Sequence, residues 1–343
     1  MDYNLLVNTL SIQTHSYESH LMERYIKKFL KKHDLEHMLD AYGNIYVTKG
    51  DSKLYPTMVS HIDTVHEINM NSVVKRHNDT LYSIDNTNFQ RTGIGGDDKV
   101  GVFITLSCLL KFDNFKAVFF KDEEVGCVGS GQCDFTFFDN STIVLQCDRQ
   151  GMGDFVDDIY GTQLSDNTLY DDIKNVLLQY DRLPASGGLT DVKSIADKND
   201  VQVANINCGY YMPHTDDEYV NITDVKDTLE FCIDIFTITS KKRYSMKRVP
   251  KKKYKSFSLA KNTTYQNSYG HFYDDWDDNN IDEIEKDEYA KTKCNACQSM
   301  STAFDPYTNQ TYCYTCDEYE TTEITTNTEL YISQSSNPNI TNS

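Results

Sequence analysis

A histidine and an aspartate two residues apart close an apolar run in the first third of the sequence. His61 and Asp63 follow the run from 57 to 60. If this run is a β-strand, side chains two residues apart project from the same face, so the Asp63 carboxylate lies beside the His61 imidazole. A carboxylate in that place orients a metal-bound histidine. For an isolated pair of this kind, the alternative is a hydrogen-bonded pair on the surface.

Two adjacent acids stand between glycines, immediately before a second apolar segment. Asp97 and Asp98 follow Gly95-Gly96 and precede an apolar pattern over 100–110 that predicts a buried helix. Two carboxylates so close together are costly unless cations neutralise them. The alternative is a helix N-cap, because the exposed amides and the helix dipole favour Asp there. Both interpretations can hold for the same residues.

A pair of glutamates follows the apolar run 117–120. Glu123 and Glu124 would then lie at the carboxyl end of a strand, which is where open α/β sheets place their functional sites. One glutamate can bind a metal ion while the other accepts a proton from metal-bound water. An ordinary charged turn is the alternative.

Two more metal-ligand candidates follow later strand-like runs. Asp148 ends the run 143–147, and His214 follows residues 209–213 after another apolar run. Imidazole and carboxylate donors together suit Zn²⁺, or Mn²⁺ or Co²⁺ in its place. A carboxylate shared by two such ions makes a two-metal hydrolytic centre.

Short β-rich apolar runs alternate with helical patterns over residues 1–240. The runs predict strands over 44–48, 56–60, 116–121, 142–146 and 201–206. The helical patterns predict a helical region over 2–34 and helices over 100–110, 171–180 and 224–237. This alternation predicts an α/β domain with a mostly parallel central sheet covered by helices. The candidate ligands would gather at the strand ends of that sheet.

In this order the motifs resemble those of the co-catalytic two-zinc exopeptidases, in particular the peptidase T tripeptide aminopeptidases. The resemblance rests on His61-x-Asp63, Gly96-Asp97-Asp98-Lys99-x-Gly101, Glu123-Glu124, Asp148 and His214. The stretch from Asp40 to Val47 is also similar to the start of that family's catalytic domain. The similarity runs from about residue 5 to residue 238, with all five motifs in order.

The resemblance implies a ligand set for two active-site zinc ions. One ion would be bound by His61, Asp97 and Asp148. The second would be bound by Asp97, Glu124 and His214, so that Asp97 bridges the two ions. The expected activity is that of a metallo-aminopeptidase, which removes N-terminal residues from short peptides.

The resemblance also implies roles for residues that do not bind metal. Glu123 corresponds to the general base, which takes a proton from metal-activated water and passes it to the leaving amine. Asp63 corresponds to the acid that supports His61, and a cis peptide bond would join Asp97 to Asp98.

The substrate cleft is expected near a glycine-rich loop and a tyrosine pair. We expect Tyr210, Tyr211 and the loop 186–191 to line it, with Asp191 meeting a substrate ammonium. Peptidase T carries an inserted lid domain between the equivalents of Asp148 and His214. An extra domain usually needs at least about 50 residues of its own, so the interval 149–213 leaves no room for a complete lid.

Other functions are also compatible with these residues: two use the same metal-assisted amide cleavage, and one involves no catalysis. An N-acyl-amino-acid deacylase or a carboxypeptidase cleaves an amide at the same kind of centre. A catalytically silent binding scaffold would act through the C-terminal part of the chain. An active metallo-aminopeptidase is favoured over a scaffold, because a scaffold need not retain costly neighbouring carboxylates such as Glu123 and Glu124.

Two Cys-x2-Cys pairs near the C-terminal end predict a zinc ribbon. Cys294 and Cys297 are separated by residues 298–312 from Cys313 and Cys316, and four thiolates would close one structural Zn²⁺ site. Two disulfides are the alternative. The predicted organisation is a catalytic domain over 1–240, a charged linker over 241–288, the ribbon over 289–320 and a disordered tail over 321–343.

Charge and hydropathy limit the partners. The net charge of −19 disfavours general attraction to nucleic acid or anionic membranes. The basic run 241–255 is the local exception and could meet nucleic acid, or it is a solvated linker; the ribbon could also bind a protein. No long apolar stretch or signal-peptide layout is present, and the single cysteines of 1–240 read as reduced, which together predict a cytoplasmic protein without a membrane segment.

Overall fold

The computed structural model describes residues 1–248, 302–305, 310–313 and 318–319. They belong to two compact units, Met1–Ser256 and Phe257–Ser343. None of the helices in these described ranges has the length and apolar character that a membrane crossing requires.

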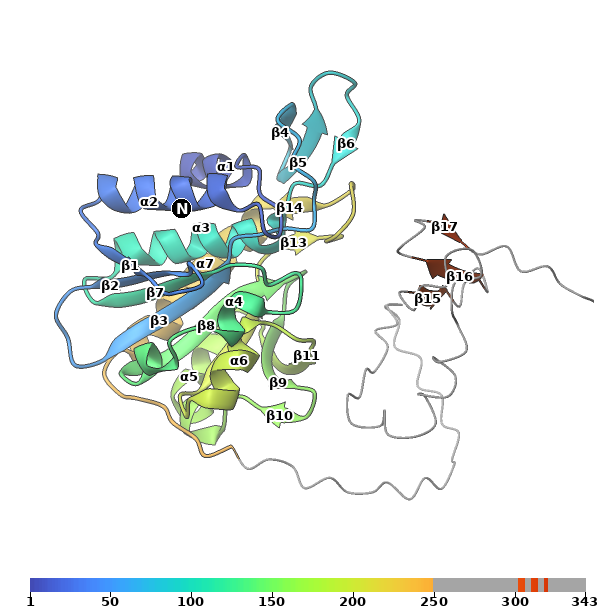
Figure 1. The fold of residues 1–343 in the computed structure, drawn as a ribbon. Helices are drawn as coiled ribbons and strands as arrows, with labels where there is room; N and C mark the ends of the chain where they lie inside the picture. Colours follow the sequence, from blue (N-terminus) through green and yellow to red (C-terminus); the bar gives the residue numbers. More distant parts are fainter. Residues whose placement is uncertain (249–301, 306–309, 314–317, 320–343) are drawn as a thin grey trace, which may run out of the picture. The chain divides into compact units, whose positions relative to one another are not determined.

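A nine-stranded mixed sheet runs through the N-terminal unit (Met1–Ser256) (Figure 1). In spatial order its strands are β1 (His37–Leu39), β2 (Ile45–Lys49), β7 (Phe115–Phe120), β3 (Tyr55–His61), β8 (Ser141–Arg149), β12 (Val203–Asn207), β9 (Asp154–Ile159) and β10 (Thr162–Gln163), with β11 (Leu183–Gly187) paired to β9. The four central strands, β7, β3, β8 and β12, are parallel to one another. Their carboxyl ends therefore meet at one edge of the sheet.

The central strands are buried on both faces, which is why they read as continuous apolar runs. Every residue of β3 and β7 is buried. Successive side chains of β3 enter different cores, since Met58 packs in one hydrophobic cluster and Val59 in the other. The sheet thus separates two helical layers.

The helices divide between these two cores (Figure 1). One core takes side chains from α1 (Tyr3–Leu10), α2 (His20–Lys32), α3 (Gly96–Lys111), α5 (Asn167–Gln179) and α7 (Ile222–Thr239). The other takes side chains from α6 (Asp191–Lys198) and the 3-10 helix η1 (Phe135–Phe138), and the short α4 (Val128–Gly131) contacts α6. The predicted α/β fold with a parallel-rich, helix-covered sheet is confirmed.

The predicted helical region over 2–34 is two helices rather than one. Residues 11–19 interrupt it, and their polar side chains reach the end of β3: Thr14 Oγ1 donates to the Ile62 carbonyl (2.7 Å) and Ser16 Oγ donates to Asp63 Oδ2 (2.8 Å). Both residues are buried. The break therefore supports the segment that follows His61.

A second, antiparallel sheet lies beyond the carboxyl edge of the first. It contains β13 (Tyr210–Tyr211), β14 (Tyr219–Asn221), β5 (Thr80–Asp85) and β4 (Ser72–His77), with β6 (Arg91–Thr92) paired to β5. The strand predictions omitted it because its strands are short or only half-buried, so they lack a sustained apolar run.

The first residues of the basic run belong to the packed N-terminal unit. Tyr244 is only 2% exposed, and its backbone N–H donates to the Thr142 carbonyl (2.8 Å). Arg248 donates to five backbone carbonyl oxygens, among them those of Val201 (2.6 Å) and Asn199 (2.7 Å). Up to this point Lys242, Arg243 and Arg248 make structural contacts, whereas Lys241 and Lys247 are exposed.

The C-terminal unit (Phe257–Ser343) contains an antiparallel sheet of β15 (Thr302–Asp305), β16 (Gln310–Cys313) and β17 (Glu318–Tyr319). Of the predicted ribbon ligands, Cys313 ends β16, whereas Cys294, Cys297 and Cys316 lie outside the described residues. Most of the predicted linker and the whole predicted tail also lie outside them.

Candidate active site

His61 lies at the carboxyl end of β3 and is held by Asp63. Its Nδ1 lies 3.3 Å from Asp63 Oδ1 and 3.1 Å from the Asp63 carbonyl oxygen, and both side chains are fully buried. The Asp63 carboxylate also accepts the backbone N–H groups of Glu123 (3.0 Å) and Glu124 (3.3 Å). Asp63 therefore contacts both the imidazole and the backbone of the glutamate pair.

Asp97 and Asp98 form the irregular first turn of α3. Their φ/ψ values are not helical, and the peptide bond between them is cis, as the resemblance implied. Asp98 is fully buried and accepts the backbone N–H groups of His61 (3.0 Å) and Gly101 (3.0 Å). Its carboxylate thus ties the end of β3 to the start of α3 and leaves Asp97 as the outward carboxylate of the pair.

The two oxygens of Asp97 face two histidines. Asp97 Oδ1 lies 3.2 Å from His61 Nε2, and Asp97 Oδ2 lies 3.4 Å from His214 Nε2. Asp148 Oδ1 is 3.5 Å from the same nitrogen of His61, and Glu124 Oε2 is 3.1 Å from the same nitrogen of His214. The five-residue cluster therefore consists of two triads that share the Asp97 carboxylate.

The donor set of this five-residue cluster fits divalent cations. Donor atoms of His61, Asp97 and Glu124 all lie within 4.8 Å of one another. Glu124 Oε1 is buried without a hydrogen-bond partner, so a ligand atom remains free. Three carboxylates face two imidazoles, and this excess of buried negative charge is what a bound metal ion offsets.

The pKa values show how strongly these groups compete for protons. Burial, together with the charge of Asp97, raises the pKa of Asp148 to about 7. Hydrogen bonds with Asp97 and Glu124 raise the pKa of His214 to about 11. In the chain without metal, protons take the place that divalent cations would fill.

Glu123 stands beside the cluster without joining either triad. Burial raises the pKa of its carboxyl well above the ordinary value, and the nearby charge of Asp148 acts in the same direction. The Cys127 thiol donates a hydrogen bond to Glu123 Oε1 (3.2 Å). A carboxylate with these properties is suited to accept a proton close to the metal-binding groups.

The predicted substrate-binding residues differ in how accessible they are. Asp191, at the start of α6, is fully buried, and its Oδ2 accepts from Gln146 Nε2 (3.2 Å). Tyr210 is 2% exposed, and its hydroxyl lies 3.4 Å from Asp148 Oδ1. Tyr211 is half-buried and donates to Asp224 (2.5 Å). Tyr210 therefore contacts the cluster directly, Asp191 is linked to Asp148 only through Gln146, and of the three only Tyr211 has appreciable solvent access.

Several polar residues around the site were not singled out from the sequence. Gln146 and Thr190 bond to Asp148. Glu218 bonds to the backbone of the segment that carries Asp97, and His66 bonds to Glu218. Gln146 lies inside a predicted strand, where polar side chains are usually unremarkable. Thr190 lies in the glycine-rich loop 186–191, which was expected to line the cleft.

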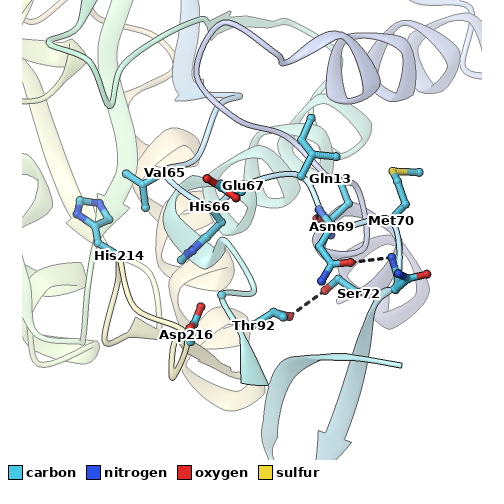
Figure 2. A pocket seen from close by; sticks show the side chains of 13 residues that line it. Gln13, Val65, His66, Glu67, Asn69, Met70, Ser72, Thr92, His214 and Asp216 are labelled. Carbon is cyan, nitrogen blue, oxygen red and sulfur yellow. Dashed lines mark hydrogen bonds between the residues drawn. The ribbon is translucent and has the colours of Figure 1, made fainter. Parts of the chain in front are cut away.

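A cavity of about 840 Å³ opens beside His214. Figure 2 shows His214 at one side and Met70 at the other, with His66, Glu67 and Asp216 between them. The cavity is bounded by the segment after β3, by the sheet of β4–β6 and by the loop that carries His214. It has room for a few amino-acid residues next to the cluster.

The interval between Asp148 and His214, which is described throughout, continues the two sheets. Strands β9, β10, β11 and β12 join the central sheet, and β13 joins the second. No separate domain stands between residues 149 and 213.

No model of a protein family matches the sequence, and no curated protein matches it either. Solved structures do resemble this one. Aminopeptidase PepT from Bacillus cereus has a TM-score of 0.58 at 15% sequence identity, over 69% of this chain and 98% of that chain. A tripeptidase from Staphylococcus aureus has a TM-score of 0.58 at 13% identity, over 70% of this chain and 98% of that chain. An aminopeptidase from the archaeon Desulfurococcus kamchatkensis has a TM-score of 0.52 at 15% identity, over 70% and 94% of the two chains. Over the matched part, the chain therefore has the fold of these solved peptidases.

Proposed function

We propose that this protein is a two-metal aminopeptidase that removes N-terminal residues from short peptides. The observation that carries the proposal is the position of Asp97, whose two carboxylate oxygens face His61 and His214 from opposite sides. Asp148 completes one triad and Glu124 the other. The shared fold with solved aminopeptidases and a tripeptidase supports the same activity class.

The two triads would hold two divalent ions, Zn²⁺ by the type of donors, with Mn²⁺ or Co²⁺ as substitutes. When bound, such ions polarise a carbonyl group and lower the pKa of a water molecule. His61, Asp97 and Asp148 would bind one ion, and Asp97, Glu124 and His214 the other.

Within this arrangement Glu123 would move the proton. Its carboxylate lies next to the cluster but contacts neither histidine, so it is free to accept a proton from the attacking water and to deliver it to the leaving amine. Asp63 would keep the His61 ring in place through Nδ1. The hydroxyl of Tyr210 lies near Asp148. The buried residues Tyr210 and Asp191 would support the cluster from the protein interior, and Tyr211 would lie closer to the substrate.

The charge of the cavity favours an aminopeptidase over a carboxypeptidase. Glu67 and Asp216 line it, and neither carboxylate makes a hydrogen bond or an ion pair with the described residues. No Lys or Arg occurs among the described residues that line it. A free substrate ammonium is therefore matched by carboxylates, whereas a substrate carboxylate has no Lys or Arg in the cavity lining to meet.

The test is a substrate panel. Free-amine di- and tripeptides, N-acylated amino acids and N-blocked peptides with a free carboxyl end are offered to zinc-loaded wild type and to a Glu123→Ala variant. We expect cleavage of the free-amine peptides only, and loss of about 10²- to 10⁴-fold in kcat in the variant with its metal content unchanged.

The panel also separates the other candidates. Turnover of acylated amino acids alone would identify a deacylase, and turnover of N-blocked peptides alone a carboxypeptidase. A folded wild type with two bound zinc ions and no turnover would identify a binding scaffold.

For the C-terminal cysteines we keep the proposal of one structural Zn²⁺ bound by Cys294, Cys297, Cys313 and Cys316. Such a module would fold around its metal because a segment of this size has little core of its own. A protein or nucleic acid is the class of partner that it would bind.

A further inference from the structure

We propose that Glu218 is a positioning residue that fixes the bridging carboxylate Asp97 relative to the ligand His214. The inference rests on the proposed two-metal function and adds to it a residue that binds no metal. Glu218 is fully buried although it carries a carboxylate, and it lies four residues after His214 in the same loop.

Glu218 is surrounded by hydrogen-bond donors. Its Oε1 accepts the backbone N–H of Asp97 (3.0 Å). Its Oε2 accepts the backbone N–H of Gly95 (2.8 Å) and lies 2.7 Å from His66 Nε2. Both oxygens therefore contact the segment that delivers Asp97 to the two histidines.

A carboxylate can accept from all three of these neighbours. All three neighbours donate when His66 carries a proton on Nε2, which is the tautomer that a carboxylate acceptor selects. A glutamine at position 218 has two possible orientations. Its NH₂ group would face either the backbone N–H of Asp97, or the backbone N–H of Gly95 together with His66. One buried donor would then face another donor and lose its partner.

The loop that carries Glu218 is itself held from the second sheet. Arg91 donates from Nη2 to the backbone carbonyls of Asp217 (3.0 Å) and Glu218 (3.0 Å), and its guanidinium lies 4.8 Å from the centre of the Tyr82 ring. Arg91 thus holds the backbone of Glu218, while Asp97, Gly95 and His66 hold its carboxylate.

The glycines next to these partners leave the space that the contacts require. A Cβ at Gly93 would lie 1.9 Å from the His66 ring, and a Cβ at Gly96 would lie 2.6 Å from Tyr210 Cβ and 3.3 Å from Glu218 Oε1. The backbone therefore approaches Glu218 and His66 more closely than any larger residue allows.

These contacts couple two metal ligands that are far apart in the sequence. Asp97 belongs to the start of α3, and His214 to the loop between β13 and β14. Glu218 joins the two segments beside the place where Asp97 faces His214. Because a shared carboxylate must meet both ions at once, a shift of either segment would weaken binding of the second ion first.

The test measures metal affinity rather than turnover alone. Mn²⁺ is titrated into the metal-depleted full-length chain, and the loss of the free-Mn²⁺ electron paramagnetic resonance signal reports binding. Mn²⁺ prefers carboxylate and imidazole donors, so four thiolates compete weakly for it. Glu218→Gln is expected to weaken Mn²⁺ binding by about 10- to 100-fold, the usual effect of losing a partner that orients a ligand.

Two further variants keep the result interpretable. Asp157→Asn removes a buried carboxylate outside the cluster, which accepts from Tyr170 Oη (2.6 Å) and Gln163 Nε2 (2.8 Å), and it should leave Mn²⁺ affinity unchanged. His66→Phe removes one of the three donors at the cavity wall and should weaken binding by a smaller factor than Glu218→Gln. If Glu218→Gln does not fold, as judged by circular dichroism, His66→Phe is tested in its place.

The proposal is overturned if Glu218→Gln, or His66→Phe in its stead, binds Mn²⁺ as tightly as wild type. It is also overturned if Asp157→Asn weakens binding equally, because the effect is then one of general stability. A wild type that binds two Mn²⁺ ions but cleaves no peptide would refute the proposed function, and the titrations would still decide the role of Glu218.

Discussion

Asp148 shows how a buried carboxylate of the cluster is oriented by neighbours that bind no metal. Its Oδ2 lies 2.6 Å from Thr190 Oγ1 and 3.1 Å from Gln146 Nε2. The Thr190 hydroxyl is also 2.8 Å from Gln146 Oε1, which accepts the backbone N–H of Val192 (3.1 Å). Since a hydroxyl has one proton, the shorter contact with the carboxylate takes it.

Thr190→Val keeps the shape of the side chain and removes this donor. We expect the variant to bind Zn²⁺ about 10-fold more weakly, because Asp148 loses a partner that fixes its orientation. Zinc titration against a competing chelator measures the change. Thr105→Val is the matched control, since the Thr105 hydroxyl is buried without a partner and its loss should not affect zinc binding. Equal affinities for the two variants would contradict the role given to Thr190.

At the scale of elements, the first turn of α3 depends on a close approach between Gly101 and Asp98. A Cβ at Gly101 would lie 2.1 Å from Asp98 Oδ1. The same carboxylate accepts the backbone N–H of His61, so the packing of this turn and the position of the histidine are linked. Besides covering the sheet, α3 therefore holds the backbone at the end of β3.

Gly101→Ala should therefore displace Asp98. We expect a loss of about 1–3 kcal/mol in the free energy of unfolding, the usual range for a group forced into a packed interior. Urea denaturation of the metal-free protein measures it. Gly131→Ala is the control, because a Cβ there meets nothing within 4 Å. A Gly101→Ala variant as stable as this control would show that the turn has room to adjust.

At the scale of the whole molecule, the buried acids make the stability of the metal-free protein depend on pH. The pKa of Asp148 is raised from 3.8 to about 7, and that of Asp191 from 3.8 to about 6, by burial in both cases. Over these windows the folded chain holds protons that the unfolded chain has released, so stability falls as pH rises. His214, with its pKa raised from 6.5 to about 11, continues the trend above pH 6.5.

We therefore expect the melting temperature of chelated protein to fall between about pH 5 and pH 8, while added Zn²⁺ stabilises it increasingly over the same range. The sign for zinc follows because metal binding needs the deprotonated ligands. Thermal unfolding with a chelator and with excess Zn²⁺, at matched ionic strength, gives both curves. A chelated protein that becomes more stable toward pH 8 would contradict the prediction.

The division into two units predicts where the metal ions reside. All five residues of the cluster lie in Met1–Ser256, and the four cysteines lie in Phe257–Ser343. A chain that ends at Ser256 should bind two zinc ions and retain peptidase activity, whereas the full chain should bind a third. Metal analysis of both proteins after dialysis decides this. Equal zinc content in the two proteins would argue against a zinc ribbon.

The sequence alone predicted the parallel centre of the first sheet because buried parallel strands appear as local apolar runs, whereas it did not predict the outer strands β1, β9, β10 and β11. Strands predicted over 56–60 and 116–121 correspond to β3 and β7, and the helix predicted over 100–110 lies within α3. The second sheet escaped prediction because its strands are short and half exposed. In such strands the intrinsic β-propensity of the residues is a weaker influence than the pairing between strands.

The same distinction applies to the site. Strand and turn signals marked the candidate positions in the sequence, and the family resemblance selected Asp97 over Asp98 and Glu124 over Glu123. The sequence could not place Glu218, whose partner Gly95 is 123 residues away, nor reveal that Asp191 is buried. Such contacts join segments through space, and no periodicity along the chain records them. Local chemistry and a family resemblance thus supplied candidate ligands with Asp97 as the expected bridge, and the tertiary structure showed which residues hold that carboxylate between the two histidines.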